Sequence, residues 1–464
     1  MTIGDSVRRA GTGRQAAFHL SALAAGAFLV RVLGEPWDTG FKITFPDSFS
    51  YLEVAGRGPF RPFDERPVAY PTFLWLTVRS VHVAVVVQTM AYAAAFLALG
   101  AVALRTLQSR VAAIAAVVLI GSIAVHARFA LWNQQILSES LGMTFATASL
   151  AAWWIFCSGP TPRRAVWAWL WTIAWMCVRD SHTVPILTVI VPVAVAAALL
   201  WRGIDPAVRR RLLGGAAVTV VLGGWIYVAQ DSSNRNQYPF HNNIGVRILP
   251  DDEMTQWFVD GGMPLNDTLR GREGHLSWDD GEVFLRDPDL EGYRDWADGP
   301  GARRFLSSLV LKFPFWYDKL VDELPNTFDD DLAAYDTYGV RDRLPTTIPG
   351  QLGGPESLRG FALWTVVAAV ALALVAAAVW RAGLPLPILL FAFFGTLSGF
   401  VEVYASYVGD ALEVSRHLVG PFSRLFLMLA ICVVLGIEAT ERLSAALERT
   451  TDVPAAPERE DELV

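Results

Sequence analysis

The feature that most constrains this 464-residue chain is a series of apolar runs, several of them about 17 to 25 residues long. A helix of about 20 apolar residues crosses the hydrocarbon core of a bilayer. The chain is 53% hydrophobic and contains 17 tryptophans, and a soluble protein would rarely carry so many such runs. The sequence therefore predicts an all-α polytopic membrane protein. About ten spans are expected, at residues 16–34, 82–104, 111–127, 141–157, 165–178, 184–201, 212–229, 358–380, 385–403 and 418–437.

Basic residues mark one side of the predicted membrane. They precede the first span and then occur at every second junction between spans. The positive-inside rule places such junctions in the cytoplasm. Both termini are therefore expected on the cytoplasmic side of a bacterial plasma membrane. The segments then predicted outside are 35–81, 128–140, 179–183, 230–357 and 404–417.

Composition divides the chain into four predicted regions. Residues 1–229 form an N-terminal membrane module with about seven spans, and residues 358–440 add about three more. Between them, residues 230–357 hold roughly half of all Asp and Glu and predict a mostly helical extracytoplasmic domain. Residues 441–464 end in a Pro- and Glu-rich stretch and predict a cytoplasmic tail that is partly disordered. No basic patch with interleaved aromatics occurs, which argues against nucleic acid as a partner.

The first outer segment carries the most informative acidic residue, Asp47. Pro46 suits the first turn of a helix, and the helix dipole favours an acidic residue there. Tyr51, four residues later, shares the face of that helix. The sequence predicts two surface helices in this segment, joined by a Pro- and Gly-rich loop. A carboxylate at the water–lipid boundary suits a reactant with a polar head and a lipid tail. The alternative is that Asp47 only caps this surface helix.

Other ionisable and aromatic candidates cluster in the predicted outer segments. Several arginines and carboxylates at one level suggest a cavity for an anionic head group, because charges at membrane depth usually face a cavity or a partner. Structural roles are the alternative: Glu139 could pair with Arg128, Arg179 and Arg416 could reach lipid phosphates, and the histidines could join helices. The candidates are Asp47, Tyr51, Arg66, Tyr70, Arg128, Glu139, Arg179, His182, Arg416 and His417.

Short motifs in this layout resemble the GT-C superfamily of integral membrane glycosyltransferases, in particular the protein mannosyltransferase and aminoarabinose transferase branches. The motifs are Pro46-Asp47-Ser48 with Tyr51-Leu52, then Tyr70-Pro71, then Leu137-Ser138-Glu139-Ser140-Leu141, and Arg179. A long outer segment between the seventh and eighth predicted spans also fits. Many relatives carry two adjacent acids in the first outer loop, whereas here Ser48 follows Asp47.

The resemblance implies transfer of a sugar from a polyprenyl-phosphate donor to a cell-envelope glycan, lipid or protein, with inversion at the anomeric carbon. Asp47 would be the catalytic general base, and Arg128, Arg179 or Arg416 would bind the donor phosphate. Tyr51 and Tyr70, with Arg66, Glu139, His182 and His417, would contact substrate. No organic cofactor is implied and no metal ligand is assigned. A divalent cation stays open, because the oligosaccharyl branch uses one and the other two generally show no such need.

Two other classes of function fit the sequence less well. A transporter or flippase of a lipid-linked glycan would usually place polar groups near the membrane midplane, whereas the candidates here crowd the outer boundary. A non-catalytic scaffold would leave the arginines and acids of the short outer loops unexplained. The acidic run Asp329-Asp330-Asp331 could bind a cation, but such runs are usually solvated loops.

Overall fold

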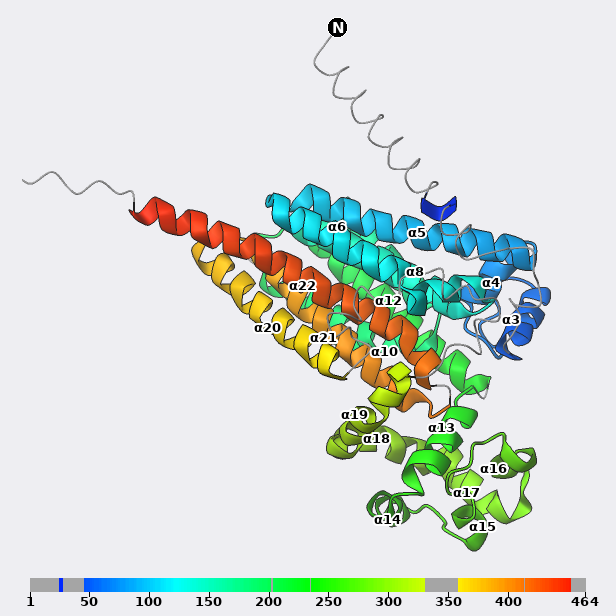
Figure 1. The fold of residues 1–464 in the computed structure, drawn as a ribbon. Coiled ribbons are helices and arrows are strands. Elements are labelled where there is room, and N and C mark those ends of the chain that lie inside the picture. Colours follow the sequence, from blue (N-terminus) through cyan, green and yellow to red (C-terminus); the bar gives the residue numbers. More distant parts are fainter. Residues whose placement is uncertain are drawn as a thin grey trace, which may run out of the picture.

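The computed structural model describes residues 25–27, 46–201, 203–233, 235–329, 358–412 and 414–451. Within these ranges the chain forms helices joined by turns, with no strand (Figure 1). The predicted all-helical class is thus confirmed for the part of the chain that the structure describes.

In the part of the chain that the structure describes, seven helical segments are long and apolar enough to cross a membrane. The sequence predicted a span at each of these places. They are α5 (Val81–Thr106), α8 (Ser138–Ser158), Asp180–Leu200, α12 (Pro206–Ser232), Phe361–Arg381 within α20 (Leu358–Arg381), α21 (Leu386–Gly409) and Val414–Arg449 within α22 (Val414–Thr451). The segment Asp180–Leu200 is built from η2 (Asp180–His182), α10 (Thr183–Pro185), η3 (Ile186–Ile190) and α11 (Val191–Leu200).

The remaining predicted spans are less regular. Helix α6 (Arg110–Val125) is followed after a 55° bend by residues Arg128–Gln134, so the two together would make an eighth span. Helix α9 (Pro162–Met176) has only 15 residues. The predicted span 16–34 lies almost wholly outside the described residues. The total of ten spans therefore stays a prediction.

Helix α22 forms the centre of the bundle. In its most apolar stretch 89% of the residues are buried, against 22% for α20, so α20 presents most of its apolar surface outward. The two helices pack side by side (Figure 1). Their approach depends on Gly436, where a Cβ atom would lie 2.7 Å from the Cβ of Ala371.

A small helical domain covers one end of the bundle (Figure 1). An aromatic core holds it together, in which His241 Nδ1 bonds the Tyr293 hydroxyl at 2.8 Å and its ring stacks on Phe284. Its segments are α13 (Gln237–Asn243), η4 (Ile244–Ile248), α14 (Asp252–Asp260), α15 (Asp267–Arg270), η5 (Asp279–Gly281), α16 (Val283–Arg286), η6 (Pro288–Leu290), α17 (Glu291–Trp296), η7 (Ala297–Gly301), α18 (Ala302–Leu311) and α19 (Phe313–Asp329).

Arg247 fastens this domain to the end of α21. The buried guanidinium donates to the backbone oxygens of Tyr407 at 2.7 Å and Asp410 at 3.3 Å, and it lies 3.9 Å from the Tyr407 ring centroid. Asn242 adds a bond to the Asp410 carboxylate at 2.9 Å. The last carbonyls of a helix have no partner within the helix, and here the domain supplies partners for them.

Candidate functional site

Asp47 lies in the first turn of α3 (Pro46–Gly56), as the sequence predicted. With α4 (Ala69–Leu76), α3 forms the pair of short helices expected before α5. The rings of Tyr51 and Tyr70 join them edge to face, with centroids 4.9 Å apart. The Tyr51 hydroxyl donates to Ser138 Oγ at 3.1 Å, and the Tyr70 hydroxyl donates to Gln88 Oε1 at 3.2 Å. These bonds fix α3 and α4 against α8 and α5.

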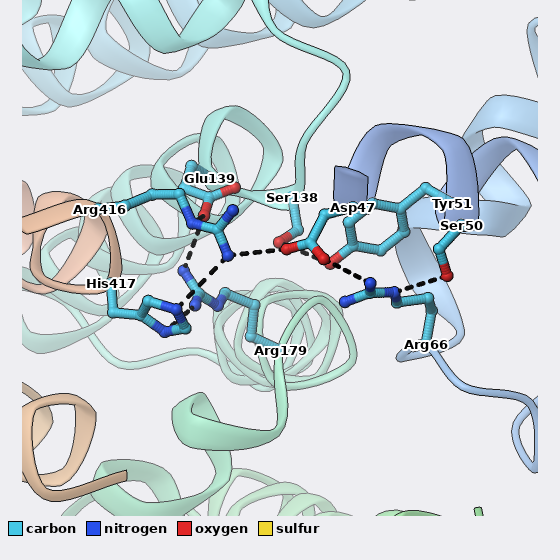
Figure 2. A network of polar contacts seen from close by, with 9 residues as sticks. All are labelled: Asp47, Ser50, Tyr51, Arg66, Ser138, Glu139, Arg179, Arg416 and His417. Carbon is cyan, nitrogen blue, oxygen red and sulfur yellow. Dashed lines mark hydrogen bonds and ion pairs between the residues drawn. The ribbon is translucent and has the colours of Figure 1, made fainter. Parts of the chain in front are cut away.

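Two guanidinium groups hold the Asp47 carboxylate (Figure 2). Arg66 Nη2 lies 2.5 Å from Asp47 Oδ1, and Arg416 Nη2 lies 2.7 Å from Asp47 Oδ2. Arg66 is itself oriented by a bond from its Nε to Ser50 Oγ at 2.9 Å. Asp47 therefore joins the first surface helix to the start of α22, 369 residues later in the chain.

Glu139 extends this network toward the bundle (Figure 2). Its Oε1 atom lies 3.3 Å from Arg179 Nη1 and 3.5 Å from Arg416 Nε. Arg179 Nη2 in turn contacts His417 Nδ1 at 2.9 Å. We call the nine residues of Figure 2 the Asp47 network: Asp47, Ser50, Tyr51, Arg66, Ser138, Glu139, Arg179, Arg416 and His417.

The Asp47 network is exposed at one end and closed at the other. The side chains of Asp47 and Arg66 are each 25% exposed, whereas Glu139 is 2% exposed and Arg416 7%. A ligand from solution would therefore meet Asp47 before Glu139.

The network carries one surplus positive charge when its histidine is neutral. Three arginines face two carboxylates, and 3 − 2 = +1. Burial raises the pKa of Asp47, but the attraction of Arg416 and Arg66 and their hydrogen bonds outweigh this, so the net pKa falls below 3.8. Asp47 is consequently ionised at neutral pH. Burial is the main cause that raises the pKa of Tyr51, so this phenol stays protonated and donates its bond to Ser138.

Three predicted site residues are not among the nine drawn in Figure 2: Tyr70, whose contacts are given above, Arg128 and His182. Arg128 is buried in α7 (Ala127–Ala130), before η1 (Leu131–Gln134), and it is not among the network residues of Figure 2. His182 lies inside the bundle, with Nδ1 3.0 Å from the backbone oxygen of Trp175 and Nε2 3.7 Å from Glu402 Oε1. Gly142 makes room for it, since a Cβ there would lie 3.1 Å from the imidazole.

Sequence reasoning overlooked a second polar cluster, which is centred on Arg424. This side chain pairs with Glu402 at 2.9 Å, bonds Ser398 and lies 4.5 Å from the Trp175 ring centroid. Arg424 and Glu402 are both buried, on α22 and α21. The available signal was a lone arginine in an apolar run, because an ionisable residue inside a span normally has a partner there.

A small cavity is lined by none of the nine residues of the Asp47 network, although two of their neighbours in the sequence belong to its wall. Pro67 and Asp180, which directly follow Arg66 and Arg179 in the sequence, contribute to its wall together with Trp225. Within the described ranges, no group of three or more His, Cys, Asp or Glu side chains is arranged to hold a metal ion. The Asp329–Asp331 run extends beyond these ranges, so that candidate is untested.

Comparison with known proteins does not assign this chain to a family. No protein-family model matches the chain, and no curated protein matches it. The geometry of the Asp47 network and the short motifs identified above are therefore the features that point to a function.

Proposed function

We propose that this protein is a GT-C-like membrane glycosyltransferase that transfers a sugar from a polyprenyl-phosphate donor to a hydroxyl of a glycan, lipid or protein. The observation that carries the proposal is the position of Asp47, ion-paired with Arg66 and Arg416 where the surface helices meet the ends of α8 and α22. A lipid-linked donor places its phosphate at such a boundary. The reaction would take place at the outer face of a bacterial plasma membrane.

The charge of the Asp47 network supports this chemistry. A sugar phosphodiester carries about −1, which matches the surplus of +1. In the reaction the bond between the anomeric carbon and the phosphate oxygen breaks, and the acceptor oxygen takes its place on that carbon. The acceptor proton passes to Asp47 as general base. Neutralising Asp47 raises the network to +2, and the departing polyprenyl phosphate then carries about −2. The summed charge of the site and its ligand is therefore about zero both before and after the transfer.

Arg416 and Arg179 are the residues best placed to bind the phosphate. Both contact Glu139, and Arg416 also contacts Asp47, so one group lies between the proposed base and the closed end of the network. Guanidinium groups bind phosphate oxygens in pairs and stabilise charge as it develops. Tyr51 and Tyr70 are buried in this conformation, so here they support the wall of the site.

The low pKa of Asp47 makes it a weak base in the state observed, because an efficient general base has a pKa nearer the working pH. We propose that the donor phosphate draws Arg416 away from Asp47. Loss of one favourable charge would raise the pKa of the carboxylate. The donor would thereby both fill the site and activate its base.

The direct test is transfer of labelled sugar from polyprenyl phosphate by the purified protein. Asp47→Asn should lower turnover at least about 100-fold, since a general base contributes roughly 10²–10⁴. Asp64→Asn is the matched control, because Asp64 belongs to the same segment but pairs with Arg57 and should retain near wild-type turnover. Equal turnover of wild type and Asp47→Asn would reject Asp47 as the base.

A transporter or flippase of a lipid-linked glycan is the second candidate, and the Arg424–Glu402 pair favours it. Charged residues inside spans often mark transport pathways, and this pair is buried between α21 and α22. Counterflow of intact lipid-linked sugar in proteoliposomes, without transfer, would support this function over glycosyl transfer.

A further inference from the structure

The turn between α18 and α19 exposes an unusual amount of apolar surface. Two turns of α18 and the first turns of α19 present apolar side chains outward, and Val310 is 77% exposed. We call these residues the α18–α19 corner: Leu306, Val310, Leu311, Phe313 and Tyr317. Soluble surfaces rarely gather so many large apolar groups in one place, and such a patch indicates a protein or membrane partner.

Two contacts with Tyr404 attach the α18–α19 corner to α21. The Phe313 ring lies 5.5 Å from the Tyr404 ring, and the Tyr404 hydroxyl donates to the backbone oxygen of Leu309 at 2.9 Å. Tyr404 is five residues before Gly409, where α21 ends. At 1.5 Å per residue, Tyr404 lies about 7–8 Å from the end of this candidate span along the helix axis.

The outward face of α21 leads directly to the corner. Phe393, Leu397, Phe400 and Tyr404 follow one another at intervals of four, three and four residues, so they share one face of the helix. Phe393 and Leu397 are exposed, as lipid-facing residues of a span would be. The row thus runs from the exposed Phe393 and Leu397 through the half-buried Phe400, which packs on Phe361 of α20, to Tyr404 and the corner.

The corner is also built to stay in place. Trp316 is fully buried and its Nε1 donates to Ser308 Oγ at 3.1 Å, which joins α19 to α18. The one lysine at the turn, Lys312, bonds Glu253 of α14 at 2.8 Å, so its charge points back to the domain. The two helices therefore present a fixed apolar edge without a charge at its tip.

We propose that the α18–α19 corner inserts into the lipid leaflet at this end of the bundle. The distance of about 7–8 Å from Tyr404 to the end of α21 agrees with the depth of about 5–10 Å to which interfacial helices bury their apolar faces. Continuity with the outward stripe of α21 favours lipid over a second copy of the chain as the occupant. The helical domain would then contact the membrane directly as well as through the bundle. This anchoring does not depend on the proposed transfer reaction.

Spin-label accessibility in the full-length protein tests this inference. Cys157, Cys177 and Cys432 are first replaced by alanine, and thermal unfolding verifies that the protein still folds. Nitroxide is attached at Val310→Cys, Leu311→Cys and, as control, Asp260→Cys, an exposed position on α14. The proteins are placed in nanodiscs of phosphatidylcholine and phosphatidylglycerol, and collision with oxygen and with a water-soluble nickel chelate is measured.

Insertion predicts that oxygen collides several-fold more effectively than nickel at Val310 and Leu311, with the reverse at Asp260. Equal nickel access at Val310 and Asp260 would place the corner in water and overturn the proposal. Low access to both reagents would show that protein covers the corner, as in a contact with a second copy, and would overturn it as well.

Discussion

At the residue scale, Asp47 links α3 to the start of α22 through its ion pairs with Arg66 and Arg416. It is the only carboxylate in the Asp47 network that contacts both Arg66 and Arg416, and it lies at the more exposed end. Its low pKa means that its ion pairs persist at neutral pH and are lost only in acid. Under the proposed function, a donor phosphate would have to relieve this attraction when it binds.

This attraction predicts a specific pH dependence of stability. A carboxyl group whose pKa is lower in the folded state stabilises the protein above its unfolded pKa, and the contribution disappears as pH falls through the folded value. The melting temperature of wild type should exceed that of Asp47→Asn at pH 6, and the difference should shrink below about pH 4. Thermal unfolding of both proteins in one detergent measures it. A difference that stays constant from pH 6 to pH 3 would contradict the assigned ion pairs.

Much of the Asp47 network could be predicted from the sequence, because its residues lie where spans begin and end. Asp47, Glu139, Arg179 and Arg416 come from four predicted outer segments, and adjacent span ends bring them to one level. Their partners could not all be predicted: the sequence suggested Arg128 as a structural partner of Glu139, and the structure also places Arg179 and Arg416 at the Glu139 carboxylate. Which arginine reaches a carboxylate depends on helix rotation, which spacing along the chain does not determine.

At the element scale, the helical domain is connected to the bundle through the end of α21. Arg247→Met would leave the Tyr407 and Asp410 carbonyls without their charged donor. Burying unpaired groups costs about 1–3 kcal/mol each, so the free energy of unfolding should fall by roughly 2–4 kcal/mol. Arg286→Met is the control, because Arg286 is largely exposed, and it should change stability little. Unfolding in SDS measures the stability of both variants. Equal losses of stability would refute the role of Arg247 in holding the domain to α21.

The Arg424–Glu402 pair makes a second prediction for α21 and α22. Removing one partner leaves a buried charge uncompensated, so Arg424→Met should destabilise the protein by roughly 3–5 kcal/mol. The double variant with Glu402→Gln should recover a large part of that loss, since both charges are then gone. Additive losses in this double-mutant cycle would mean that the two side chains do not stabilise each other.

Apolar length predicted the long helices well but not the interrupted ones. The π-helical turn η3 and the bend after α6 occur within runs that read as uniform apolar segments. Packing against neighbouring helices determines such local departures, whereas hydropathy reports only the average character of a run. The many short helices of the α13–α19 domain were likewise expected as helical but could not be delimited.

At the scale of the whole molecule, the two ends of the bundle carry different sets of charged residues. Arg105, Arg110 and Arg381 lie at helix ends opposite the α13–α19 domain, whereas the Asp47 network lies at the end that the domain covers (Figure 1). The positive-inside rule then predicts that domain and network share the outer side.

Cysteine labelling tests this orientation. A membrane-impermeant maleimide should modify Gly292→Cys in intact cells, and Arg449→Cys only after the membrane is permeabilised. Both positions are exposed in the structure, so access to each depends on the side of the membrane. Labelling of Arg449→Cys alone in intact cells would invert the topology and remove the basis for an extracytoplasmic reaction.

The most direct test of the central claim, that Asp47 and a lipid phosphate compete for the same arginine, is equilibrium binding of polyprenyl phosphate to the purified protein. We predict that Asp47→Asn binds this ligand more tightly than wild type, because the network charge rises from +1 to +2 when one carboxylate is removed. Arg416→Met should bind it more weakly. Unchanged affinity in both variants would contradict the account.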